Sequence, residues 1–148
     1  MAVKTNYSNI KVEGLDQLAK NSDRIIKQVH GVLGEATLEA AKMMQADAVK
    51  RAKEKTGALK RGIIAKVTWD KKKSKAFSAI MMDPGMNDIF VKTTSTGKRY
   101  YYPASIEYGH KGGAKPYPFM SRAFKAKKRN VRKIIESHIK QAIEGAVK

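Results

Sequence analysis

Residues 100–124 read YYYPASIEYGHKGGAKPYPFMSRAF, and they decide how the last helix joins the rest of the chain. Pro103 fits the first turn of a short helix, which Gly109 ends. Three glycines and two prolines between residues 109 and 118 predict a loop, and Pro118 suits the first turn of a longer helix. The stretch admits three interpretations, which are a phosphate-binding loop, a catalytic pair of Glu107 and His110, and a structural joint.

A long helix is expected on the N-terminal side, over residues 22–54. Asn21 or Ser22 can serve as its N-cap, and Asp23 suits the positive end of the helix dipole. Gly31 and Gly34 each cost about 1 kcal/mol relative to alanine inside a helix, so they mark a bend or a close approach of another backbone. Apolar residues recur at helical spacing along one face, at Ile25, Val29, Val32, Ala36, Ala40 and Met43.

Four strands are expected between the two long helices, at residues 62–69, 76–82, 88–94 and 98–102. Before them, Thr56 can cap a short helical turn that carries Leu59. The short turns that separate the strands predict an antiparallel meander. We therefore expect one α+β domain over residues 1–148, with a β-meander of about four strands packed against the N-terminal and C-terminal helices, which cover one face of the sheet. Residues 1–13 are expected to form an arm or a short strand, followed by a short helical turn that carries Leu15 and Leu18.

The charge of the chain is its strongest global signal, because 31 Lys and Arg residues against 13 Asp and Glu give +18 over 148 residues. Such a field favours a polyanionic partner. The chain has no cysteine and three scattered histidines, so we predict no disulfide and no metal site. No apolar stretch reaches the length of a membrane span or resembles a signal peptide, which predicts cytoplasmic assembly without a membrane partner.

Two of the three interpretations of residues 100–124 lack supporting residues. Glu107 and His110 flank a glycine on a short turn with no nucleophile nearby, so no catalytic residue and no cofactor are predicted. A P-loop needs G-x-x-x-x-G-K-[ST], whereas Pro116 follows the lysine here and the glycine spacing differs. Looser contact with a polyanion stays open, through Lys111 and Lys115 of the loop and the first half of the last helix. The helical candidates for this contact are Lys125, Lys127, Lys128, Arg129 and Arg132.

Two segments resemble motifs of the phage head–tail joining proteins, the tail-completion or neck family of long-tailed bacteriophages. TGALKRGI at residues 56–63 is similar to the Thr-Gly-x-Leu-basic motif of that family. YPASIEYG at residues 102–109 is similar to its Tyr-Ala-x-x-Val-Glu-Phe-Gly run, which leads through a short loop into Pro-Phe at the start of a terminal helix. The segment VKTTSTGKRYY at residues 91–101 is an insertion relative to the family pattern. The matching positions are Tyr102, Ile106, Glu107, Tyr108, Gly109, Pro118, Phe119 and Ala123.

The resemblance implies a structural virion protein without catalysis, a homo-oligomeric ring at the head–tail interface. Its partners would be the connector or head-completion proteins and the tail terminator or tail tube protein, with genomic DNA passing non-specifically through the lumen. Tyr102, Tyr108 and Phe119 would anchor the joint between the sheet and the last helix. The candidate residues for the joint and the subunit interface are Tyr102, Ile106, Glu107, Tyr108, Gly109, Pro118 and Phe119.

Two alternatives stay open from the residues themselves. The charge alone also fits a non-specific nucleic-acid-binding protein, although no helix-turn-helix, zinc-finger or aromatic RNA-binding signature accompanies it. The aromatic residues around the joint are either core or interface anchors, because strand alternation places Tyr101 on the opposite sheet face from Tyr100 and Tyr102.

Overall fold

The computed structural model describes residues 15–72, 75–113 and 115–148, so the arm predicted at residues 1–13 lies outside the described residues. The fold is mixed α+β, as predicted, with a long helix near each end of the described chain. In chain order the elements are α1 (Leu15–Arg51), α2 (Ala58–Arg61), β1 (Ile63–Trp69), β2 (Ala76–Met82), η1 (Pro84–Met86), α3 (Asn87–Phe90), β3 (Val91–Thr93), β4 (Arg99–Tyr101), α4 (Tyr102–Tyr108) and α5 (Phe119–Val147).

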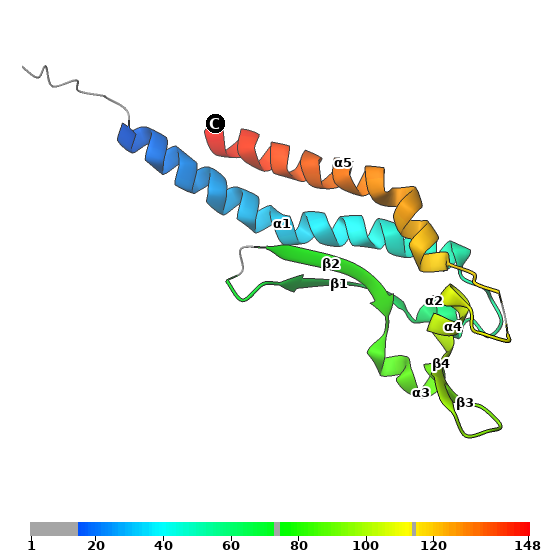
Figure 1. Cartoon of the computed structure of the whole chain (residues 1–148). Coiled ribbons are helices and arrows are strands. Elements are labelled where there is room, and N and C mark those ends of the chain that lie inside the picture. Colours follow the sequence, from blue (N-terminus) through cyan, green and yellow to red (C-terminus); the bar gives the residue numbers. More distant parts are fainter. Residues whose placement is uncertain (1–14, 73–74, 114) are drawn as a thin grey trace, which may run out of the picture.

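Helix α1 forms the middle layer of the molecule, with α5 along one side and the β1–β2 ribbon along the other (Figure 1). The prediction that both long helices cover one face of the sheet is therefore wrong, since only α1 lies along the ribbon. Small buried side chains on α1 favour this arrangement. Ala36, Ala40, Ala41 and Ala48 are fully buried, and alanine lets a helix and a sheet approach the same helix closely.

Helix α1 starts earlier than the expected residue 22 and ends at Arg51, before the expected residue 54. The N-cap prediction is wrong because Asn21 lies inside the helix, where Gln17 Nε2 donates a hydrogen bond of 3.4 Å to Asn21 Oδ1. The two glycines predicted to mark a bend or a close approach, Gly31 and Gly34, have different surroundings. A Cβ at Gly31 would meet open space, whereas a Cβ at Gly34 would lie 2.9 Å from Trp69 Cζ2. Gly34 thus makes room for an aromatic ring and not for another backbone.

The four strands pair in two separate antiparallel sheets and do not form one continuous meander. Strands β1 and β2 pair over seven residues each, from Ile63 with Met82 to Trp69 with Ala76. Strands β3 and β4 form a hairpin of three residues each, which lies inside the expected strands 88–94 and 98–102.

The first half of the expected strand at residues 88–94 is helical, because η1 and α3 occupy residues 84–90. Asp83 starts this turn, and its side chain accepts a hydrogen bond of 2.9 Å from the Gly85 N–H. The turn places Phe90 in the core, where its ring is fully buried. A Cβ at Gly62 would overlap this ring, so the glycine leaves the space that Phe90 fills. Burial of the ring thus outweighs the strand propensity of the segment.

The core lies where the end of α1 meets α2, the start of β1 and the first turns of α5. The predicted turn after Thr56 is present, since the Ala58 N–H lies 3.4 Å from Thr56 Oγ1 and α2 buries Leu59. The cluster of buried residues at this place comprises Ala48, Ala52, Leu59, Ile63, Phe119 and Ala123. Half-buried side chains around it include Ile80, Met82, Ile106, Tyr117 and Met120.

Candidate functional site

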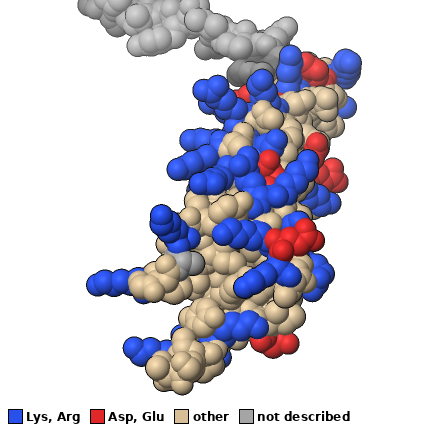
Figure 2. Space-filling view, turned by 90° about the vertical axis from the view of Figure 1, so that its right-hand side faces the viewer, with Lys and Arg blue, Asp and Glu red and all other residues tan. Residues whose placement is uncertain are grey.

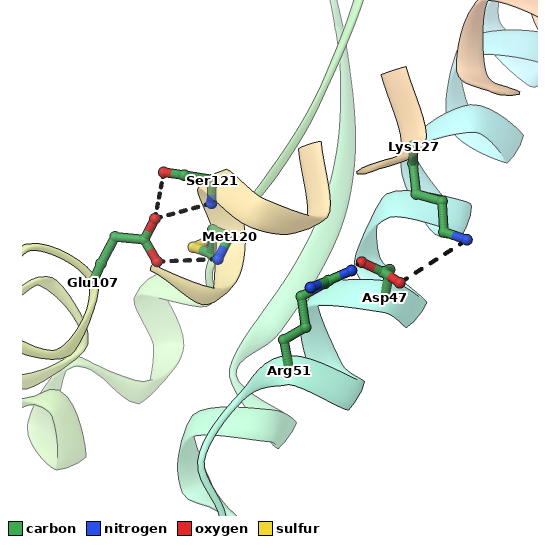
Figure 3. A network of polar contacts seen from close by, with 6 residues as sticks. All are labelled: Asp47, Arg51, Glu107, Met120, Ser121 and Lys127. Carbon is green, nitrogen blue, oxygen red and sulfur yellow. Dashed lines mark hydrogen bonds and ion pairs between the residues drawn. The ribbon is translucent and has the colours of Figure 1, made fainter. Parts of the chain in front are cut away.

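The joint between α4 and α5 is built around one buried carboxylate. Helix α5 follows Pro118, which has no side-chain acceptor for the free N–H groups of the first turn. Glu107, on α4, supplies this acceptor from 13 and 14 residues away in the sequence. The Met120 N–H donates to Glu107 Oε2 at 3.0 Å, and the Ser121 N–H donates to Glu107 Oε1 at 2.9 Å (Figure 3). A negative charge at this end of a helix is also favoured by the helix dipole.

The Ser121 hydroxyl donates a third hydrogen bond to Glu107 Oε1, at 2.5 Å. Glu107 is only 5% exposed, so its burial is compensated by these three donors. Ser121 is not among the site residues predicted from the sequence. The available signal was a serine within the first turn of a helix whose N-cap position holds a proline.

Backbone and ring contacts hold the loop on both sides of this carboxylate. The Tyr117 N–H donates to the Ile106 carbonyl at 2.7 Å, which ties the end of the loop to α4. Gly109 ends α4 with φ of 69°, in the region that favours glycine. Lys53 Nζ lies 4.5 Å from the centroid of the Tyr117 ring, a cation–π contact between the segment that follows α1 and the loop.

The structure places the seven predicted joint residues at three levels of burial. Glu107 and Phe119 are buried, while Tyr102, Ile106, Pro118 and Gly109 are partly buried. Tyr108 is 73% exposed, so the prediction that it anchors the joint is wrong within a single chain. Tyr102 is the first residue of α4, and the strand alternation that separates Tyr100 from Tyr101 therefore ends before it.

The suggested pair of Glu107 and His110 is not brought together. Both oxygens of Glu107 accept hydrogen bonds from α5. His110 is exposed and lines a different hollow, on the side of the β3–β4 hairpin. The geometry therefore forms no acid–base couple from these two side chains.

Among the described residues, some of the predicted polyanion-contacting cations have a carboxylate partner and others do not. Lys127 Nζ lies 3.9 Å from Asp47 Oδ1, and Arg51 Nε lies 2.5 Å from the other oxygen of the same carboxylate (Figure 3). Arg132 Nε donates to Glu136 Oε1 at 2.6 Å, which raises the pKa of Arg132 through this hydrogen bond and the attraction of the two charges. Lys127 and Arg132 thus each have a carboxylate partner, although the Arg132 side chain is 81% exposed.

The remaining predicted cations are exposed, and Figure 2 shows Lys and Arg side chains over the whole visible face with the few acidic side chains mostly toward one edge. Exposed cations on one helix face attract polyanions without selecting a sequence. The members of this group are Lys111, Lys115, Lys125, Lys128 and Arg129.

Tyr101 lies on the core side of the β3–β4 hairpin. Its ring meets the Phe90 ring edge-on, with centroids 6.1 Å apart. Burial raises the pKa of the Tyr101 phenol, because the charged phenolate would lose its hydration there. Its neighbour Tyr100 is 40% exposed and faces the other side of the hairpin. The aromatic residues thus serve both as core and as exposed surface.

Within the described ranges, no group of three or more His, Asp or Glu side chains is placed to hold a metal ion. No helix in the described part of the chain is long and apolar enough to cross a membrane. Comparisons with protein-family models, with curated proteins and with solved structures find no match to this chain.

Proposed function

We propose that this protein is a structural component of a phage neck or tail, which forms a ring at the head–tail interface and lets DNA pass. The observation that carries the proposal is the contact of Glu107 with the first turn of α5. Glu107 belongs to the first segment that resembles the head–tail joining family, and it bonds Met120 and Ser121, which directly follow Pro118 and Phe119 of the second segment. This contact gives the spacing between the two segments a physical reason.

The outer side of the joint offers a surface suited to a neighbouring subunit. A hollow of about 300 Å³ lies beside Glu107, with Met82, Tyr101, Pro103 and Met120 in its walls. Tyr108 stands at the same hollow with most of its ring exposed. A large exposed aromatic side chain beside a mostly apolar hollow is typical of interface anchors.

Ring formation is tested with the purified full chain by sedimentation velocity at rising protein concentration. We expect one closed oligomer to replace the monomer, because head-to-tail contacts that close make a ring of fixed size. Tyr108→Ala is expected to shift this transition to at least about tenfold higher concentration, as for an interface anchor. Phe124→Ala is the matched control, since Phe124 is 51% exposed on α5 and lies outside the joint. A chain that stays monomeric throughout contradicts self-assembly.

The place of the protein in the particle is tested separately, by immunogold labelling of intact phage particles. Label is expected at the junction of head and tail. Label over the capsid shell or the tail tip, or particles without any label, would overturn the assignment to the neck.

A second candidate is a non-specific nucleic-acid-binding protein, favoured by the net charge of +18 and the exposed cations of α5. A duplex-DNA titration at two salt concentrations tests it. A protein that neutralises several phosphates loses orders of magnitude in affinity as salt rises. Micromolar or tighter binding at physiological salt favours this candidate, whereas binding seen only at low salt favours passive passage of DNA.

A further inference from the structure

A basic hollow of about 500 Å³ lies between the β3–β4 hairpin and the loop that follows α4. Its walls hold three cationic side chains, a histidine, a tyrosine ring and two hydroxyl groups, and no acidic side chain. These residues are Lys98, Arg99, Lys111, His110, Tyr100, Thr94 and Ser105. The hairpin supplies four of them, and it belongs to the segment that is inserted relative to the head–tail joining pattern. The hollow is therefore a feature of this chain, separate from the joint.

Hydrogen-bonded turns hold both walls of the basic hollow. In the hairpin, the Thr94 N–H donates to the Lys98 carbonyl at 2.9 Å, and the Lys98 N–H donates to Thr94 Oγ1 at 3.1 Å. In the opposite wall, the Gly113 N–H donates to the His110 carbonyl at 3.1 Å. The His110 ring folds over Gly113, where a Cβ would overlap it. These turn contacts restrain both walls, which lowers the entropy cost of binding.

The cations of the basic hollow have no counter-ion among the described residues. Lys98, Arg99 and Lys111 form no ion pair there, whereas Lys60, Lys127 and Arg132 each lie within 4.0 Å of a carboxylate oxygen. Three like charges around one hollow repel each other, and an anion that enters it removes this repulsion. Tyr100 adds an exposed apolar face to the same wall.

We infer that the basic hollow binds an acidic peptide segment of a partner protein, one that carries carboxylates next to an apolar side chain. The arginine and the lysines would bind the carboxylates, and the Tyr100 ring would cover the apolar side chain. The inference goes beyond ring formation, because it holds for any partner with such a segment.

Two other occupants fit the basic hollow less well. Duplex DNA presents its phosphates on a rigid convex surface, which suits the long exposed face of α5 better than a recess between two loops. A second copy of this chain offers few carboxylates to the hollow, because it has only 13 Asp and Glu against 31 Lys and Arg. A short acidic segment avoids both problems, since it is narrow, flexible and opposite in charge.

The test uses the full chain and a fluorescein-labelled acidic peptide of glutamate, aspartate, one leucine and one phenylalanine, by fluorescence anisotropy. At an ionic strength of about 0.15 M, where long-range attraction is screened, we expect saturable binding. The same peptide with glutamine and asparagine in place of the acids is expected not to bind. The variant Lys98→Ala/Arg99→Ala/Lys111→Ala is expected to weaken binding by at least about tenfold, through lost charge-assisted hydrogen bonds. Circular dichroism confirms that this variant is folded.

The matched control removes three exposed cations from α5 and keeps the hollow, in the variant Lys125→Ala/Lys128→Ala/Arg129→Ala. It is expected to change peptide affinity by less than about twofold, because only screened long-range attraction is lost. Equal weakening by both variants, or no saturable binding of the peptide, overturns the proposal. A competition experiment between the labelled peptide and DNA is the last test. If single-stranded or duplex DNA displaces the peptide at equal charge concentration, the hollow is a nucleic-acid site and not a peptide site.

Discussion

Helix α4 separates two charged regions that differ in how their charges are satisfied. On one side, the carboxylate of Glu107 is buried and accepts three hydrogen bonds from α5. On the other side, Lys98, Arg99 and Lys111 surround a hollow without a counter-ion among the residues described. The two regions share the short α4 and lie within the same stretch of sequence, yet only one is complete within the chain.

The contrast shows which charged residues serve the fold and which are left for a partner. A buried charge is tolerated only when hydrogen bonds replace its hydration, and every bond of Glu107 lies within the chain. Exposed cations keep their hydration and cost the fold little, so they are free to meet an anion from outside. The joint is therefore expected to govern stability and the basic hollow to govern binding. Variants of the joint and of the basic hollow therefore separate these two roles.

Phe119→Ala is expected to lower the free energy of unfolding by about 3–5 kcal/mol, because it leaves a cavity in the core. Phe119 is 1% exposed and belongs to the cluster that joins α5 to α1 and β1. Urea denaturation measures the loss. Phe124→Ala removes a ring that is 51% exposed on the same helix, so it is expected to change stability by about 0.5 kcal/mol or less. Similar losses in the two variants would show that the first turn of α5 is not packed as described.

Glu107→Ala is expected to cost about 1–3 kcal/mol of stability, since two N–H groups of α5 lose their acceptor. Glu107→Gln keeps one oxygen acceptor and should lose less, because an amide nitrogen replaces the other oxygen and cannot accept. Thermal and urea unfolding of both variants check that Glu107→Ala loses more stability than Glu107→Gln. Glu136→Ala serves as the control, since its carboxylate is exposed and pairs only with Arg132. If Glu107→Ala and Glu136→Ala lower the stability by the same small amount, the Glu107 carboxylate does not cap α5.

The sequence allowed the elements with strong local signals to be predicted. Strand β2 was placed at its observed bounds, and β1 within one residue, because β-branched and apolar residues end at clear turns. The N-cap of α1 was misplaced, since Asn21 and Ser22 are tolerated within a helix that continues on both sides. The helical turn at α3 could not be predicted, because it depends on the pocket that Gly62 leaves for Phe90. That contact joins residues far apart in the chain.

The candidate site was predicted in part. The short helix, the loop after it and the start of the last helix followed from Pro103, Gly109 and Pro118, whose backbone preferences act locally. The interpretation of the segment as a joint came from the family resemblance. The partner of Glu107 did not follow, because capping from another helix depends on how α4 and α5 meet in space. The basic hollow was missed, since Lys98 and Lys111 come together only when the hairpin folds beside the loop. No periodic pattern in the sequence predicts that the hairpin and the loop lie side by side.

A smaller effect is expected where the hairpin meets the core, at Tyr101. Burial raises its phenol pKa, so the folded chain keeps a proton that the unfolded chain loses near pH 10, at about the ordinary tyrosine pKa. This contribution to stability is fully present below the unfolded pKa and is lost as pH rises through the folded pKa. Tyr101→Phe should therefore lose less stability than the wild type between neutral and strongly alkaline pH. Urea unfolding at neutral and at strongly alkaline pH measures this difference. Equal losses of stability at alkaline pH in the two proteins would contradict it.

The smallest effect on stability is expected from the cations of the basic hollow. Lys98→Ala/Arg99→Ala/Lys111→Ala should leave the free energy of unfolding within about 0.5 kcal/mol of the wild type, because no ion pair with a described residue is lost. Removing three like charges from one hollow also relieves repulsion, so any change should be toward higher stability. Urea unfolding at low and high salt measures the change in the free energy of unfolding and the part of it that comes from charge repulsion. The two can be separated because salt screens the repulsion in the wild type. A clear loss of stability at both salt concentrations would show that these cations support the fold, and the contrast with Glu107 would then fail.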